Sequence, residues 1–160
     1  MRNRRGPMVA VIGAAQASEE HVSLAERVGQ LLAERGAVVV CGGRGGVMQA
    51  ACRGAELAGG VSIGLLPGSD PGEANPHVTF ALPTGLGQGR NLLVVLAACS
   101  VIAIGGGYGT LSEIALALKA GKRVIGLDTW QVEHPDGSPV EILLARTPEA
   151  AVSLALSEVG

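Results

Sequence analysis

Short apolar runs, each closed by glycine or another turn residue, recur along this chain. Runs rich in Val, Ile and Leu without polar alternation are typical of strands buried on both faces of a parallel sheet. Six segments have this pattern, at residues 8–13, 37–41, 61–66, 78–82, 101–104 and 123–127. Helical segments separate most of them. The pattern therefore predicts an α/β fold, a Rossmann-like doubly wound parallel sheet, in a single domain over residues 1–160.

The expected helices have recognisable boundaries. Ser18 is a suitable N-cap for a helix over 18–35, and Gly36 stands just beyond its end. Further helices are predicted from residue 47 to about 58, over 87–100 and over 111–120. Thr147 and Pro148 open a final helix that reaches about Glu158. Residues 67–76 and 130–138 carry the turn residues of loops.

The segment 87–100 is apolar nearly all round, with the run Leu92 to Ala98 uninterrupted by any polar residue. A helix at the surface of a monomer has only one covered face, so this pattern predicts burial on both sides. The second face would then meet another subunit. We therefore expect a homodimer or a higher homo-oligomer.

Composition and charge argue against several classes of function. The formal net charge is −2, and the chain holds one Phe, one Trp and one Tyr, so neither a basic patch nor a set of stacking rings is available for nucleic acid. No apolar stretch reaches the length of a membrane span, and no signal peptide is expected. The three cysteines, Cys41, Cys52 and Cys99, are an odd number without a C-x-x-C pair, which favours the reducing cytoplasm.

Two glycine-rich loops follow strands within an internal repeat, in which 38–65 resembles 102–127. Glycine permits close backbone approach, and the N–H groups and dipole of a helix N-terminus attract a phosphate. Loops at the carboxyl ends of parallel strands face one crevice, so both are expected to flank a shared phosphorylated, nucleotide-like ligand. The predicted binding residues are Gly42, Gly43, Arg44, Gly45 and Gly46 in the first loop and Gly106, Gly107, Tyr108, Gly109 and Thr110 in the second.

Each of these features has an alternative interpretation. Either loop could provide tight strand-to-helix packing without a ligand, and Arg44 could be an ordinary exposed loop residue. Thr110 could cap the helix or donate to a phosphate. The second loop has Thr110 where a dinucleotide-binding fingerprint needs its third glycine, and no triphosphate-binding P-loop is present, so NAD and ATP hydrolysis are disfavoured.

Two charged residues are candidates for chemistry. Glu113 lies one turn into the helix after the second loop, where its carboxylate would point back toward a bound ligand. Arg90 opens the apolar helix and could fork onto a phosphate or carboxylate. The alternatives are a glutamate favoured by the helix dipole and a solvated arginine. The three histidines are scattered without ligand spacing or an acidic partner, so neither a metal site nor a resident cofactor is expected.

The run Gly105-Gly106-Gly107-Tyr108-Gly109-Thr110-Leu111-Ser112-Glu113 resembles the P-G-G-x-G-T-x-x-E signature of the Lonely-guy family, whose members were once taken for lysine decarboxylases. The first loop, running from Cys41 to Met48, is similar to that family's upstream G-G-G-x-x-G-L-M motif. The likeness covers residues 8–127. It implies a Rossmann-like homodimer that cleaves the N-glycosidic bond of a nucleoside 5′-monophosphate, with Arg90 and Glu113 as the catalytic residues.

Several positions depart from that family's pattern. Gly105 replaces the proline, Ser112 the first glutamate, and Asn91 the lysine after the arginine, while Gln88 and Gly89 stand where a histidine and a glutamate are usual. These departures resemble a sister branch of the same SLOG superfamily, the molybdenum cofactor carrier proteins, which bind a phosphorylated pterin without turning it over. The leading hypothesis is thus a phosphorylated, nucleotide-like ligand with possible phosphoribohydrolase activity; the alternative is a non-catalytic carrier or sensor.

Overall fold

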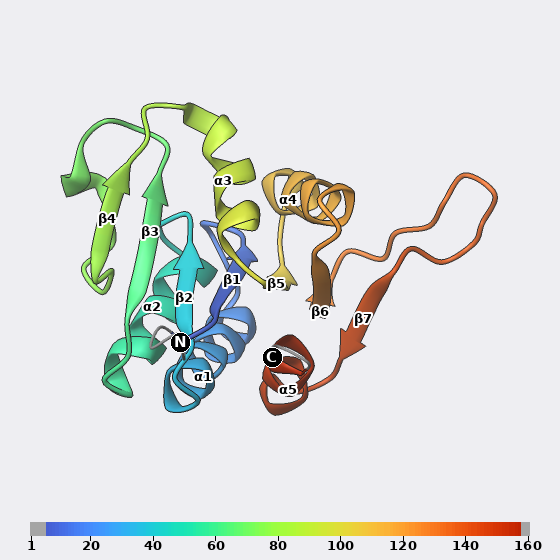
Figure 1. Ribbon diagram of the computed structural model, residues 1–160, viewed down its shortest axis with the longest axis horizontal. Helices are drawn as coiled ribbons and strands as arrows, with labels where there is room; N and C mark the ends of the chain where they lie inside the picture. The colour runs from blue at the N-terminus through green and yellow to red at the C-terminus, as the bar shows by residue number, and fades with distance from the viewer. Residues whose placement is uncertain (1–5, 158–160) are drawn as a thin grey trace, which may run out of the picture.

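A computed structural model describes residues 6–157 as one α/β unit built on a seven-stranded sheet (Figure 1). The strand order is β4-β3-β2-β1-β5-β6-β7, and every neighbouring pair is parallel. The strands are β1 (Met8–Gly13), β2 (Val38–Cys41), β3 (Ser62–Leu66), β4 (Phe80–Pro83), β5 (Ser100–Gly105), β6 (Arg123–Thr129) and β7 (Ile142–Ala145). The predicted doubly wound parallel sheet is confirmed.

Five α-helices cover the two faces of this sheet: α1 (Glu19–Glu34), α2 (Val47–Leu57), α3 (Arg90–Ala97), α4 (Tyr108–Lys119) and α5 (Pro148–Leu156). Helices α1, α2 and α5 pack on one face, and α3 and α4 on the other (Figure 1). Each face has its own apolar core, so the central strands are buried from both sides. This double coverage explains why their sequences run apolar without alternation.

The helix ends predicted from capping residues agree with the structure. The Ser18 hydroxyl accepts a hydrogen bond from the His21 N–H at 3.1 Å, and Gly36 has the positive φ of 76° that follows many helices. At α5 the Thr147 hydroxyl accepts from the Ala150 N–H at 3.1 Å. That helix ends at Leu156, and Glu158 lies outside the described residues.

Several predicted boundaries are wrong. Strand β4 begins at Phe80 rather than at residue 78, and β6 continues to Thr129 rather than ending at residue 127. The helix expected over 87–100 begins with a 3-10 turn, Gly87–Gly89, and α3 ends at Ala97. Ser100 is the first residue of β5, where its hydroxyl donates to the Ala155 carbonyl at 2.9 Å and is therefore tolerated in the core. The helix expected over 111–120 begins at Tyr108, so the second half of the glycine loop forms its first turn.

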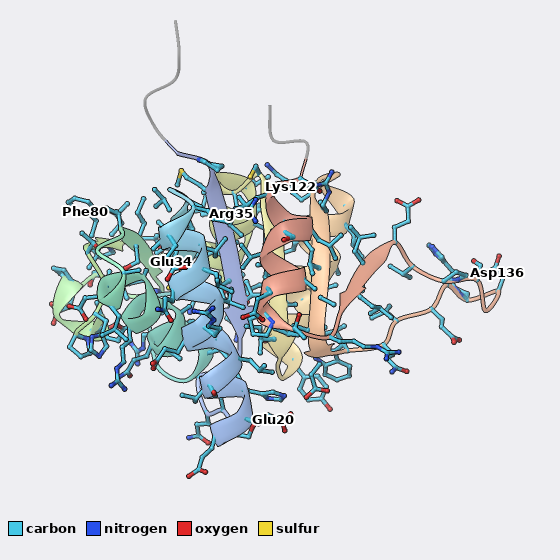
Figure 2. The ribbon with its side chains drawn as sticks, turned by 90° about the horizontal axis from the view of Figure 1, so that it is seen from below. Glu20, Glu34, Arg35, Phe80, Lys122 and Asp136 are labelled. Atoms are coloured by element: carbon cyan, nitrogen blue, oxygen red, sulfur yellow. The ribbon has the colours of Figure 1, made fainter. Side chains whose placement is uncertain are left out.

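Strand β7 was not predicted at all. It has four residues, all apolar, and lies at the edge of the sheet, where Leu144 is 76% exposed. Its short apolar run was the available signal. The connection from β6, residues 130–141, contains no helix. It projects as an arm from the body of the molecule, with Asp136 at its tip (Figures 1 and 2).

Helix α3 is covered on one face only in this single chain. Val94 and Val95 are fully buried against the sheet, whereas Leu92, Leu93 and Leu96 are 38–48% exposed. The expected burial on both sides is therefore absent within one chain, and the predicted oligomer stays a prediction. No helix in residues 6–157 combines the length and the apolar character needed to cross a bilayer.

The strand order creates a crevice beside β1. The chain passes from β1 to β2 through α1 on one face, and from β5 to β6 through α4 on the other, although β1 and β5 are neighbours. The loops that follow these two strands therefore diverge. Such a switch point at the carboxyl ends of parallel strands is where ligands bind in open α/β sheets.

Candidate functional site

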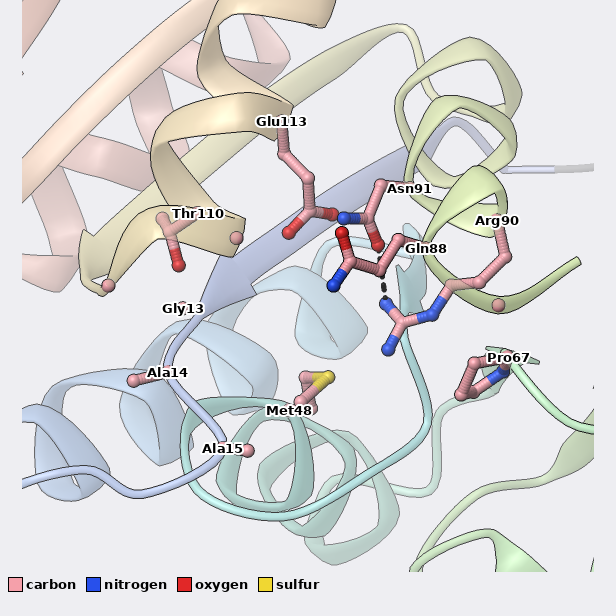
Figure 3. A pocket seen from close by; sticks show the side chains of 13 residues that line it. Gly13, Ala14, Ala15, Met48, Pro67, Gln88, Arg90, Asn91, Thr110 and Glu113 are labelled. Carbon is pink, nitrogen blue, oxygen red and sulfur yellow. Dashed lines mark hydrogen bonds between the residues drawn. The ribbon is translucent and has the colours of Figure 1, made fainter.

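A cavity of about 380 Å³ opens at this switch point (Figure 3). Its volume lies within the range of small-molecule sites. Residues from five segments of the chain line it: Gly13, Ala14, Ala15, Met48, Pro67, Gly87, Gln88, Arg90, Asn91, Gly107, Gly109, Thr110 and Glu113. The predicted catalytic pair and three residues of the second loop are thus brought to one cavity.

The second glycine loop forms one wall, at the N-terminus of α4. Gly105 and Gly106 have φ values of 53° and 109°, which side chains rarely adopt. Gly107 is the N-cap residue and offers no side-chain cap, so the first backbone N–H groups of α4 have no partner of that kind. Thr110 lies inside the first turn and is 3% exposed, so it does not cap this helix.

Gly107 and Gly109 separate the two interpretations of this loop. A Cβ built at either position would meet no heavy atom within 4 Å, and neither residue has a positive φ. Gly106 differs, because a Cβ there would collide with Thr110. Packing and backbone strain therefore account for glycine at Gly106 and not at Gly107 or Gly109, where the open space is the cavity itself.

The first glycine loop does not line this cavity. None of the predicted residues Gly42 to Gly46 is part of its wall, and the residue closest to them in sequence that is part of it is Met48 on α2. A Cβ at Gly42 would collide with the Arg90 guanidinium and with the Met48 sulfur, so glycine here makes room for Arg90. Arg44 instead pairs with Glu73, Nη1 to Oε2 at 3.1 Å.

Arg90 lines the cavity and carries one buried donor without a partner in the described part of the chain. Its Nη1 donates to the Asn91 Oδ1 at 3.0 Å, but its buried Nε has no hydrogen-bond partner among residues 6–157. Burial lowers the pKa of Arg90, while the negative charge of Glu113 acts in the opposite direction. A buried guanidinium N–H without a partner is costly. The charge of the group remains available to an anion in the cavity.

Glu113 lies on the wall opposite Arg90, on α4 (Figure 3). Its side chain is buried, with the residue only 6% exposed, and burial raises its pKa to about 7. The charge of Arg90 partly offsets this rise. Near neutral pH the carboxyl group is therefore divided between a protonated donor and a charged acceptor, a property of groups that exchange protons with ligands.

The sequence analysis missed eight of the thirteen residues that line the cavity. Gly13, Ala14 and Ala15 follow β1, and the run of small residues after the first strand was the available signal. Pro67 and Gln88 come from the loops after β3 and β4. Nothing in their local sequence marks them as cavity residues, because Pro67 is placed by the path of the chain out of β3 and Gln88 by its crossing from β4 to β5.

The expectation that the histidines lack acidic partners is wrong for two of them. The His21 Nε2 lies 2.7 Å from the Asp128 Oδ2, and the His77 Nδ1 lies 2.6 Å from the Glu56 Oε2. Both are pairs rather than larger clusters. Within the described part of the chain, no group of three or more His, Cys, Asp and Glu side chains is arranged to hold a metal ion.

The chain is similar to solved proteins of the same fold over nearly its whole length. It is 37% identical to the molybdenum cofactor binding protein of Rippkaea orientalis, with 95% of this chain and 96% of that one covered and a TM-score of 0.85. The molybdenum cofactor carrier protein of Chlamydomonas reinhardtii is 33% identical over 93% of this chain and 95% of that one, with a TM-score of 0.79. The DNA processing protein A of Streptococcus pneumoniae shares the fold at 19% identity and a TM-score of 0.71, over 92% of this chain and 61% of that one.

An uncharacterized protein of Archaeoglobus fulgidus is 41% identical over 149 residues, which cover 93% of this chain and 94% of that protein. The model of the SLOG cluster4 family matches residues 6–152, which include every strand, both glycine loops and the whole cavity. The resemblance to this superfamily is thereby confirmed over nearly the entire sequence. The chain belongs to the SLOG cluster4 family.

Proposed function

We propose that this protein binds a phosphorylated pterin of the molybdenum cofactor type in the cavity between β1 and β5, as a carrier rather than an enzyme. The observation that carries the proposal is the full-length similarity to two molybdenum cofactor proteins, at 33–37% identity and over at least 93% of each chain. Similarity of this extent includes the loops that surround the cavity and not only the strands of a common fold.

The chemistry of the cavity supports a phosphorylated ligand. The N-terminus of α4 presents free N–H groups beside Gly107 and Gly109, where no side chain blocks an approaching anion. Arg90, which lines the same cavity, adds a guanidinium group from α3. A protonated Glu113 can donate a third hydrogen bond, which makes an acidic side chain compatible with an anion at neutral pH.

The test is direct binding. The protein is produced in cells that make the molybdenum cofactor, purified under exclusion of air, and analysed for bound pterin by fluorescence after oxidation and for molybdenum by elemental mass spectrometry. We expect both, in equimolar amounts. Gly107→Val should abolish them while leaving the fold intact, because a side chain at Gly107 meets only open space.

The control is Ser23→Val, which introduces the same side chain at an exposed position of α1 that does not line the cavity. It should keep its bound pterin. Retention of pterin by the Gly107→Val variant would contradict the proposed site.

Hydrolysis of a nucleoside 5′-monophosphate is the second candidate. One observation favours it: the catalytic pair expected from the Lonely-guy resemblance, Arg90 and Glu113, lines a single cavity. Arg90 would orient the substrate, and the charged form of Glu113, placed near C1′, would stabilise an oxocarbenium-like transition state. Incubation with AMP followed by chromatography of free adenine tests this. Release that Glu113→Gln abolishes supports an enzyme, and binding without release rejects it.

A further inference from the structure

Two of the three aromatic side chains in this protein meet at the second glycine loop. Tyr108 and Trp130 are the only Tyr and the only Trp in the chain, and 22 positions separate them. Their rings stack, with centroids 6.1 Å apart and an interplanar angle of 30°. Such pairs are favourable beyond the area they bury, so the contact fixes the orientation of both rings.

Two contacts hold the Trp130 side chain in place. Its ring packs against the core on the face of α3 and α4, and its Nε1–H donates to the Gly107 carbonyl at 3.1 Å. This hydrogen bond joins the start of the 130–141 arm to the residue at the N-terminus of α4. Trp130 is thus a rigid support for the glycine loop and for the ring stacked on it.

Tyr108 is the opposite case, because it is 86% exposed, more than any other large apolar side chain in residues 6–157. It stands between Gly107 and Gly109, which both line the cavity. The cavity wall itself contains no aromatic side chain in the described structure. Tyr108 does not line the cavity itself, so a flat ligand ring meets its exposed face where the ligand extends beyond Gly107 and Gly109 over the start of α4.

We propose that Tyr108, supported by Trp130, stacks on the flat heteroaromatic ring of the ligand whose phosphate is held at the N-terminus of α4. This inference rests on the proposed binding function and adds to it the residue that recognises the ring. Stacking on a heteroaromatic ring tolerates differences in ring substituents, since every such ring has a π-face. Selectivity for a ring over a bare phosphate would then come from Tyr108.

The test separates ring from phosphate. Calorimetric titration with 6-hydroxymethylpterin monophosphate measures affinity for ring and phosphate together, and inorganic phosphate is measured as its competitor. Tyr108→Ala should weaken binding of the pterin phosphate about tenfold or more, the effect expected for loss of one stacking partner. The affinity for inorganic phosphate, obtained from the competition titration, should be unchanged. Tyr108→Phe, which keeps the ring, should bind both as the wild type does.

Fluorescence gives a second measurement in the wild-type protein, because Trp130 is its only tryptophan. Pterin phosphate should quench the Trp130 emission, and inorganic phosphate should not. Unchanged affinity of Tyr108→Ala for the pterin phosphate, or an equal loss for both probes, would overturn the role of Tyr108 alone. A wild-type protein that binds neither probe would overturn the proposed function and this inference with it.

Discussion

Replacement of Glu113 by glutamine isolates the cost of a buried carboxylate in the cavity. In the folded protein, burial raises the pKa of Glu113 to about 7 from the ordinary value of 4.5. Glutamine has nearly the same shape, can form hydrogen bonds and never ionises. The variant therefore removes the charge of this residue at every pH while keeping its volume in the cavity wall.

The sign of the effect follows from proton binding. Between pH 4.5 and pH 7 the folded protein keeps the Glu113 proton, whereas the unfolded chain releases it. The free energy of unfolding therefore falls as pH rises through this window, and the loss is complete above pH 7. A pKa raised this far corresponds to a loss of about 3 kcal/mol. The Glu113→Gln variant does not show this loss in the free energy of unfolding, because glutamine does not ionise.

Urea denaturation from pH 4.5 to 8 measures the difference. The free energy of unfolding of Glu113→Gln, minus that of the wild type, should increase by about 3 kcal/mol from the lowest to the highest pH. Glu20→Gln, at an exposed position in the first turn of α1, is the control and should show no comparable trend (Figure 2). Parallel curves for the wild type and Glu113→Gln would refute the reasoning about this cavity.

Two further variants test the site and the assembly. Gly109→Ala places a methyl group in open space in the first turn of α4, so it should raise the free energy of unfolding by up to about 1 kcal/mol and weaken binding of pterin phosphate, whereas Ser23→Ala on α1 should leave binding unchanged. Urea denaturation and calorimetry measure both effects, and unchanged affinity would argue against phosphate at this turn. Leu93→Glu charges the exposed face of α3 and should reduce the mass measured by light scattering to that of a monomer; a monomeric wild type would refute the predicted oligomer.

Most of the fold was predictable because its signals are local. A strand covered on both faces must be apolar throughout, and the β1, β2 and β5 sequences show this directly. Capping by Ser18 and Thr147 depends on residues within one turn. Strand β7 carries the same kind of signal, an apolar run of four residues, which the prediction overlooked. The end of α3 was obscured by the apolar character that continues into β5.

The candidate site was predictable only in part. Glu113 and the second loop are near in sequence, so helical geometry alone places that side chain beside Gly109 and Thr110. The first loop was expected to be an equal wall because its sequence repeats that of the second. The two loops differ because α2 and α4 pack on opposite faces of the sheet. In addition, the space beside Gly42 is filled by the Arg90 guanidinium.

The sequence by itself determined a parallel α/β sheet, a glycine loop at a helix N-terminus, and a carboxylate one turn beyond that loop. Tertiary structure decided which residues share the cavity, how far Glu113 is buried, and that Tyr108 stacks on Trp130. The division has a physical reason: backbone patterns depend on neighbours within a turn or a strand. Burial, pKa and ring stacking depend on segments such as β1, α3 and the arm, which meet only when the strands assemble in their final order.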